Sequence, residues 1–382
     1  MRLLILTSST GGCHDMRARA FAEWAQAEPQ FGIAVESHWP MEQSHWIYAV
    51  SVELYNWIQR TAPLLHHLYY NFLEVASVIR TPKPLGADRF RAVLERVRPD
   101  VVLSVHDSLN HTFFDHVRAV LGRDRVRCVT YCDELHGGYG FSRHWVNPAA
   151  DLFIGVVPET CDAARRWGMA EEKIFLGGFM TRRFFYDPAP TATERDAYIR
   201  NELQFDPQQF ILLLMASGRG AQNHIRFLEA LKRRHMETQV VALCGKSTEA
   251  AQAVAAWGQA NPSLRVRVLP HDTNVGKLMR SVSAVVARPG AGTTSEAIVS
   301  HCPLLINCSG GLMPQELINV KFCRKHGIAE TLREPDDLAR VVAEWKNNPD
   351  LPAGVRQRMA AVCPSSGPRD ILARIAALQP AP

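Results

Sequence analysis

Residues 286–297 read VARPGAGTTSEA and join an apolar strand to a helix through a glycine-rich turn. Glycines in such a turn allow the backbone to approach an anion closely, and the unpaired N–H groups and positive dipole end of the helix face that anion. The two threonines add hydroxyl donors, and the glutamate is placed to accept hydrogen bonds from two ribose hydroxyls. We therefore predict a nucleotide-diphosphate site made by Gly290, Gly292, Thr293, Thr294 and Glu296.

The same turn also has a purely structural interpretation. Thr293 can be the N-cap of the helix, with Glu296 as the reciprocal partner in a capping box. The turn alone does not separate this interpretation from nucleotide binding, so the rest of the chain has to decide between them.

The chain has 382 residues, of which 47% are hydrophobic, and this is enough material for two cores. Strand-length apolar runs alternate with helix-length segments in both halves, which is typical of buried parallel sheets. The predicted strands are 3–7, 33–37, 101–105, 126–131, 152–156, 211–215, 239–244, 264–269, 284–287 and 303–306.

A proline-containing segment, residues 185–193, separates the two sets of strands and is interpreted as a linker. We therefore predict an α/β protein with two Rossmann-like domains that face each other across a cleft. The first covers residues 1–187 and the second residues 188–364. Residues 365–382 are expected to form a C-terminal helix that returns to the first domain.

Composition excludes several classes of protein. The net charge is +5 without a dense Lys/Arg stripe, so a nucleic-acid partner is not expected. Nine scattered cysteines without a C-x-x-C pair indicate reduced thiols in the cytoplasm, and no metal site is predicted. Because no run of about 18 apolar residues exists to span a bilayer, the protein is expected to contact a membrane only at the membrane surface.

Several polar residues follow predicted strands, where ligands of such sheets bind. His14 comes after Gly12 in the first turn and can take a proton from an acceptor hydroxyl, although the more common role of a lone histidine beside a turn is structural. Asp133, Glu134 and His136 follow the fourth strand and His106 ends the third. They are either an acid–base cluster or ordinary turn residues.

Residues 39–72 are rich in Trp, Tyr and Phe, and Trp46, Tyr55 and Trp57 lie near a helical period. Aromatic side chains of this kind prefer a membrane interface or an apolar acceptor chain. The alternative is helices packed on the core of their own domain. If this segment docks, it does so through apolar more than electrostatic contacts.

Further strand ends in the second half extend the predicted donor site. Gly218 and Arg219 follow one strand and suit a phosphate, while His271 follows another and its backbone suits a base. Gln315, Glu316 and Asn319 come after the last predicted strand, where they suit the hydroxyls of a sugar.

Together these motifs resemble the nucleotide-sugar glycosyltransferases that include monogalactosyldiacylglycerol synthases, processive diacylglycerol glucosyltransferases and MurG. The donor loop of that family, Pro-Gly-x-Gly-Thr-x-x-Glu, is matched by residues 289–296. Residues 314–319, PQELIN, are similar to Pro-Gly-Gln-Glu-x-x-Asn without its glycine, and residues 11–14, GGCH, to Gly-Gly-Gly-His. Ser-Thr-His and Thr-Asp-Leu motifs are echoed by residues 104–106, SVH, and 132–134, CDE.

The resemblance, over roughly residues 1–330, implies the GT-B fold and an inverting, metal-independent transfer from a nucleotide sugar, expected to be a UDP-sugar. His14 would be the general base, with Asp133 as the second candidate. The acceptor, a lipid such as diacylglycerol or another apolar molecule, would contact Gly12, Trp46, Tyr55, Trp57, His106 and His136. No cofactor is expected beyond the nucleotide-sugar co-substrate.

The implied location is cytoplasmic, and peripheral on the inner face of the cell membrane. Cys13 and the missing glycine before Gln315 depart from the family pattern and indicate a divergent acceptor or sugar. Two other functions use a similar fold: a nucleotide-sugar 2-epimerase, which needs no apolar surface, and a nucleotide-sugar-binding protein without turnover.

Overall fold

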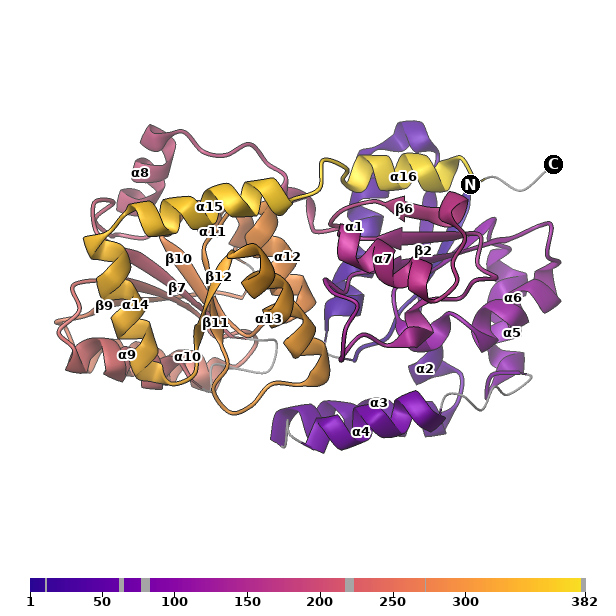
Figure 1. Ribbon diagram of the computed structural model, residues 1–382, viewed down its shortest axis with the longest axis horizontal. Coiled ribbons are helices and arrows are strands. Elements are labelled where there is room, and N and C mark those ends of the chain that lie inside the picture. Colours follow the sequence, from indigo (N-terminus) through magenta and orange to yellow (C-terminus); the bar gives the residue numbers. More distant parts are fainter. Residues whose placement is uncertain (11, 62–64, 77–82, 217–222, 272, 379–382) are drawn as a thin grey trace. The chain divides into compact units, whose positions relative to one another are not determined.

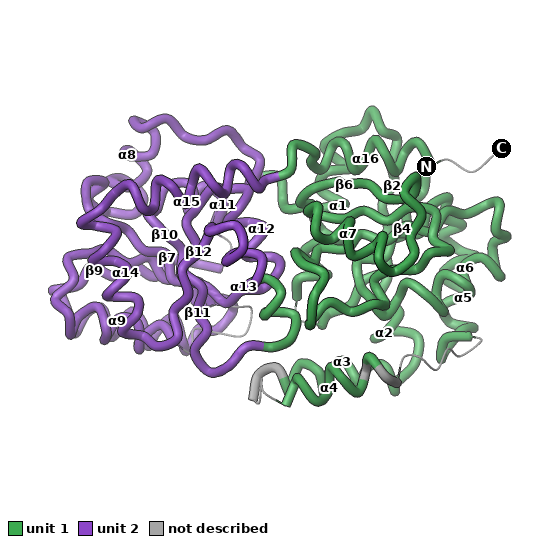
Figure 2. The backbone as a smooth tube through the Cα atoms, in the orientation of Figure 1, with its two compact units in different colours: residues 1–183, 313–319, 364–382 green, residues 184–312, 320–363 purple. Residues whose placement is uncertain are grey.

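The computed structural model describes the chain except residues 11, 62–64, 77–82, 217–222, 272 and 379–382. The chain forms two compact units, shown in different colours in Figure 2. The first comprises Met1–Arg183, Met313–Asn319 and Pro364–Pro382, and the second comprises Phe184–Leu312 and Val320–Cys363. The chain therefore passes from one unit to the other four times.

The first unit is built on a six-stranded parallel sheet in the order β2-β1-β3-β4-β5-β6. Its strands are β1 (Arg2–Leu6), β2 (Ala34–His38), β3 (Val101–Ser104), β4 (Arg127–Cys132), β5 (Leu152–Gly155) and β6 (Ile174–Leu176). Its helices are α1 (Cys13–Ala27), α2 (Pro40–Gln43), α3 (Trp46–Thr61), α4 (Leu65–Ala76), α5 (Ala87–Val97), α6 (Thr112–Leu121), α7 (Pro158–Arg166) and α16 (Pro368–Ala376).

The second unit contains another six-stranded parallel sheet, in the order β12-β11-β10-β7-β8-β9. Its strands are β7 (Ile211–Met215), β8 (Gln239–Leu243), β9 (Arg265–Leu269), β10 (Ala284–Ala287), β11 (Leu304–Asn307) and β12 (Ala329–Leu332). Its helices are α8 (Ala192–Asn201), α9 (His224–Arg233), α10 (Thr248–Ala260), α11 (Val275–Ser281), α12 (Ala291–Val299), α13 (Pro314–His326), α14 (Pro335–Asn347) and α15 (Asp350–Val362), although the first residues of α13 are grouped with the first unit.

Both cores follow from continuous apolar strands between helical layers. Residues Leu3 to Leu6 of β1 are fully buried, and every residue of β3, β5, β10 and β11 is buried. Parallel pairing places the carboxyl ends of the strands at one edge of each sheet, so the loops after β1, β3 and β4 lie close together.

The C-terminal helix α16 packs on the first unit beside α1 (Figure 1). Its apolar face buries Ile371, Leu372 and Ile375 completely. Gly177 makes room for this contact, because a Cβ atom there would lie 2.8 Å from Cγ1 of Ile371. Arg369 of α16 pairs with Glu28 at 2.7 Å.

Candidate functional site

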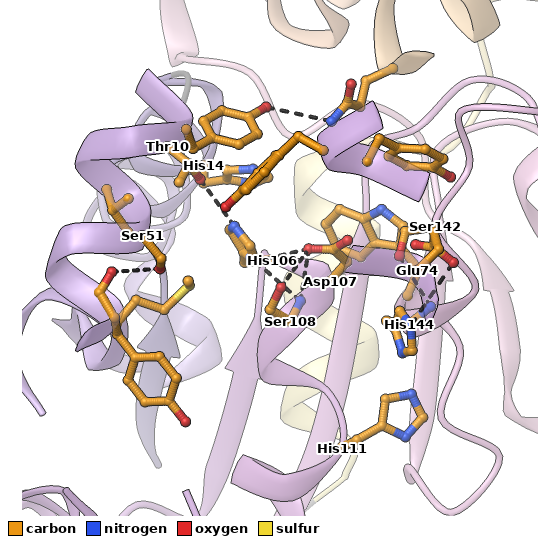
Figure 3. Close-up of a pocket in the computed structure, with 18 of the residues that line it drawn as sticks. Thr10, His14, Ser51, Glu74, His106, Asp107, Ser108, His111, Ser142 and His144 are labelled. Carbon is orange, nitrogen blue, oxygen red and sulfur yellow. Dashed lines mark hydrogen bonds and ion pairs between the residues drawn. The ribbon is translucent and has the colours of Figure 1, made fainter. Parts of the chain in front are cut away.

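A cavity of about 460 Å³ lies in the first unit at the carboxyl ends of its strands (Figure 3). One part of its wall is polar and comes from the loops after β1, β3 and β4. The other part comes from α3 and α4 and is largely aromatic. The lining includes Thr10, His14, Tyr55, Tyr69, Tyr70, His106, Asp107, Glu134 and Gln315.

His14 reaches this cavity from the second position of α1. Gly12, with φ +83°, supplies the left-handed N-cap that turns the chain into the helix. The Nδ1 atom of His14 lies 2.6 Å from the carbonyl oxygen of Val105. Because a carbonyl can only accept, Nδ1 carries the hydrogen and Nε2 is left as an acceptor.

Burial lowers the pKa of His14 to about 4, and the neighbouring His106 adds to this effect. The imidazole is therefore neutral at physiological pH. A neutral ring with a lone pair on Nε2 is the form that removes a proton from a hydroxyl group.

His106 extends the polar wall and orders its neighbours. Its ring lies 4.5 Å from that of His14, centroid to centroid, and its Nε2 is 3.0 Å from the hydroxyl of Thr10. Its Nδ1 lies 3.0 Å from Oδ1 of Asp107. Burial alone would raise the pKa of the Asp107 carboxyl, but His106, Ser142 and His144 together outweigh it, and the pKa lies well below its usual range.

Asp133 lies next to this wall and is held by two neighbours. Nε of Arg17 is 3.1 Å from its Oδ2, and the Cys13 thiol donates to the same atom at 3.0 Å. Burial raises the pKa of Asp133, but Arg17 and His14 lower it by more. Among the described residues Asp133 is not part of the cavity lining, so its geometry favours a fixed negative charge over a proton acceptor.

Glu134 is a lining residue whose importance the sequence did not single out from its neighbours. It is 9% exposed, and its Oε2 has no hydrogen-bond partner among the described residues. Burial, with the charges of Asp133 and Asp107, raises the pKa of this carboxyl well above its usual value. Its burial and its place in the cavity wall are not visible in a motif of neighbouring polar residues.

The predicted acceptor residues do not all meet in the cavity. His14, His106 and Tyr55 line it, together with Gln315, whose Nε2 lies 3.5 Å from the hydroxyl of Tyr55. Trp46 and Trp57 are instead exposed on the outside of α3, at 68% and 53%. His136 is half-buried in the loop after β4, and among the described residues it is not in the lining.

Trp46 and Trp57 belong to an exposed apolar face, here called the α3–α4 face. Residues on α3 and α4 recur at spacings of three and four, so they share one side of each helix. The face consists of Trp46, Ile47, Val50, Leu54, Trp57, Leu65, Leu68 and Phe72, all between 44% and 70% exposed. None of the described helices is both long and apolar enough to cross a bilayer.

The predicted nucleotide site lies in the second unit, where α12 starts directly after β10. Gly290 is the N-cap, and no side chain caps the helix. The capping-box interpretation is therefore wrong, because Thr293 is the third helical residue and cannot cap. Gly292, Thr294 and Glu296 are buried, and the hydroxyl of Thr294 has no hydrogen-bond partner among the described residues.

The loops around this helix start are held by Arg288. Its guanidinium donates to the carbonyl oxygens of Ser309 at 3.0 Å and Gly311 at 2.8 Å, which joins the loop after β10 to the loop after β11. A Cβ added at Gly290 would meet no atom within 4 Å, so the turn is open at that point.

The remaining predicted donor residues are spread more widely. His271 is exposed in the turn after β9. Gly218 and Arg219 lie outside the described residues. Gln315, Glu316 and Asn319 lie on α13 within the segment grouped with the first unit, and Oε2 of Glu316 accepts from the backbone N–H of Met313 at 3.0 Å. The described residues hold no cluster of His, Cys, Asp and Glu suited to a metal ion.

Two family models match the chain. Residues 16–180 match monogalactosyldiacylglycerol (MGDG) synthase, and residues 213–348 match the glycosyltransferase family 28 C-terminal domain. Monogalactosyldiacylglycerol synthase 2 of Arabidopsis thaliana is 25% identical over 362 residues, which are 90% of this chain and 73% of that protein. The chain spans only 66% of the length of the corresponding enzyme of Spinacia oleracea.

Solved structures support the fold. MurG of Acinetobacter baumannii superposes with a TM-score of 0.63 at 14% identity and covers 99% of both chains. Anabaena HepE, solved in complex with UDP-glucose, gives a TM-score of 0.55 at 14% identity, over 99% of this chain and 98% of that one. The predicted α/β architecture of the GT-B type is thus confirmed.

Proposed function

This chain fits the glycosyltransferase family of monogalactosyldiacylglycerol synthases and MurG, and from that premise we propose that it transfers a sugar from a nucleotide sugar to a hydroxyl group of a lipid. The observation that carries the proposal is the neutral His14, with Nε2 as acceptor, in a cavity with an aromatic wall. Such a cavity suits an apolar molecule that ends in a hydroxyl group.

The chemistry proposed is an inverting displacement. Nε2 of His14 accepts the proton of the acceptor hydroxyl while its oxygen attacks the anomeric carbon, and the bond from that carbon to the diphosphate breaks. The N–H groups at the start of α12 stabilise the charge that develops on the leaving diphosphate. In this proposal the helix N–H groups take the role that a metal ion has in other transferases, so no metal ion is needed.

Roles for the remaining residues follow from their positions. Glu296 is proposed to accept from the ribose hydroxyls, and Thr293 and Thr294 to donate to phosphate oxygens. UDP is the proposed nucleotide, as in the UDP-glucose complex of HepE. Asp133, charged and paired with Arg17, is proposed to stabilise the imidazolium that forms at His14, a role distinct from that of a second base.

The α3–α4 face supports a peripheral membrane location. Its apolar side chains are exposed and would be covered by the interfacial layer of a bilayer. A lipid acceptor could then enter the cavity, whose wall is formed by the same two helices.

A transfer assay tests this function. Purified protein is mixed with vesicles that contain diacylglycerol and with radiolabelled UDP-galactose or UDP-glucose, in the presence of EDTA. We expect label in the lipid fraction, and a melting temperature raised by the true donor. Release of a 2-epimer of the sugar without labelled lipid would instead assign the chain as an epimerase, and stabilisation without any turnover as a binding protein.

A further inference from the structure

The carboxyl group of Glu134 is an unusual component of the cavity wall. The loop after β4 is fixed at this point, because the backbone carbonyl of Glu134 accepts a hydrogen bond from the buried hydroxyl of Thr160. The side chain is nine-tenths buried and lines the cavity, yet its Oε2 has no hydrogen-bond partner among the described residues. Buried polar atoms normally have a partner, so this carboxyl group of the cavity wall can still bond a ligand atom in the cavity.

The neighbouring charges determine what kind of atom that is. Asp133 and Asp107 are carboxylates close enough to oppose ionisation of Glu134, and burial acts in the same direction. Burial and these two charges therefore favour the protonated form of Glu134. A protonated carboxyl group has one O–H donor, and it suits an uncharged oxygen acceptor.

The position of this donor limits the acceptor molecule. Glu134 shares the polar wall with His14 and His106, whereas the wall from α3 and α4 is largely aromatic. An acceptor whose reactive hydroxyl lies at His14 would thus carry a second oxygen near that hydroxyl, followed by an apolar portion. In a glycerolipid, the oxygen that fits this description is an ester carbonyl.

We propose that Glu134 donates a hydrogen bond to an ester carbonyl oxygen of the acceptor lipid and thereby selects ester-linked over ether-linked glycerolipids. This inference rests on the proposed function, since it takes a lipid hydroxyl as the acceptor. Glu134 acts here on specificity and takes no part in the transfer of the proton.

A comparison of two lipids tests the proposal. 1,2-Dioleoylglycerol and its diether analogue, which differ in the two carbonyl groups, are offered in the same vesicles to the full-length protein. We expect the wild type to use the ester with kcat/KM about tenfold higher or more, mainly through a lower KM. Glu134→Leu should lose this preference by weakening use of the ester alone. Glu134→Gln keeps an N–H donor and should retain it.

The controls separate the possible failures. Unchanged melting temperatures, and an unchanged shift on UDP addition, show that the variants are folded with an intact donor site. Equal use of ester and ether by the wild type would overturn the role of Glu134, as would a Glu134→Leu variant that keeps the ester preference. If neither lipid is glycosylated, the lipid acceptor of the proposed function has failed instead. A loss of kcat alone in Glu134→Gln would indicate a catalytic role and also contradict the proposal.

Discussion

At the scale of single residues, the tautomer of His14 decides what the cavity can do. The Val105 carbonyl fixes the hydrogen on Nδ1. Burial lowers the pKa of the ring to about 4, so the ring is neutral at any pH well above that value. An exposed histidine with a pKa near 6.5 would be mostly protonated below about pH 6, and a protonated ring cannot accept a proton. The fold thus keeps the base active at a pH where an ordinary histidine fails.

We expect His14→Ala to lower kcat by roughly 10² or more, the usual effect of losing a general base, with little change in UDP affinity. In the wild type, kcat/KM should fall on the acid side with a midpoint near pH 4 and not near 6.5, because His14 is neutral above its lowered pKa. Steady-state rates between pH 4 and 8 measure both effects. Near-normal turnover of His14→Ala would contradict this role and would assign the general base to His106 or Asp133 instead.

Glu296 offers a second test at this scale. With the capping box excluded, its replacement by alanine removes no helix cap. Glu296→Ala should lower UDP affinity at least about tenfold, because hydrogen bonds to a charged carboxylate contribute about 1.5–3 kcal/mol each. Calorimetric titration with UDP measures this.

The matched control for Glu296 is Glu344→Ala, on the exposed side of α14 in the same unit, which should bind UDP normally. If folded Glu296→Ala protein binds UDP with unchanged affinity, Glu296 does not contact the ribose.

At the scale of elements, ten of the twelve strands could be predicted from the sequence, with ends shifted by at most one residue. The two missed strands, β6 and β12, are the outermost strands at one end of each sheet. β6 has three half-buried residues, and β12, AETL, includes polar ones. β12 lacks the continuous apolar run that identifies a central strand, whereas β6, IFL, is apolar but only three residues long.

The candidate site was predictable where it depends on order along the chain. His14 and His106 follow strands whose carboxyl ends meet, so parallel topology alone brings them together. The exposure of Trp46 and Trp57, and the burial of Glu134, depend instead on which side of a helix or loop faces the core. Aromatic content and motif spacing do not contain that information.

The α3–α4 face leads to a prediction at the scale of elements. The double variant Trp46→Ser/Trp57→Ser should weaken partition onto lipid vesicles about tenfold or more, because moving each large aromatic side chain out of water lowers the free energy of the bound state. The melting temperature should stay nearly unchanged, because both side chains are already exposed. Vesicle sedimentation and a melting curve measure the two quantities.

Trp167→Ser is the control, since Trp167 is 50% exposed in the same unit but follows α7, outside this face. A lower melting temperature with unchanged vesicle binding would show that the face covers a core and no membrane.

At the scale of the whole molecule, a different C-terminal helix completes each unit. The second unit ends with α15, and α16 completes the first. Ile371→Ala on α16 should destabilise the first unit by about 2–5 kcal/mol, as expected for a large side chain deleted from a core. Met359→Ala on α15 should act on the second unit by a similar amount.

Differential scanning calorimetry, with and without UDP, distinguishes the two effects. UDP should raise the transition of the second unit, so only the Met359→Ala transition should recover with ligand. A single transition that both variants lower equally, and that UDP raises in both, would mean that the units unfold as one.

The four passages of the chain between the units have a consequence for recombination. A gene fragment that ends near Arg183 lacks α16 and the Met313–Asn319 segment, so it encodes an incomplete first unit. Chimaeras that exchange a unit with a relative therefore need three separate pieces of coding sequence for the first unit and two for the second. Inheritance of one half from a different ancestor by a single crossover would leave α16 facing a surface with which it did not evolve.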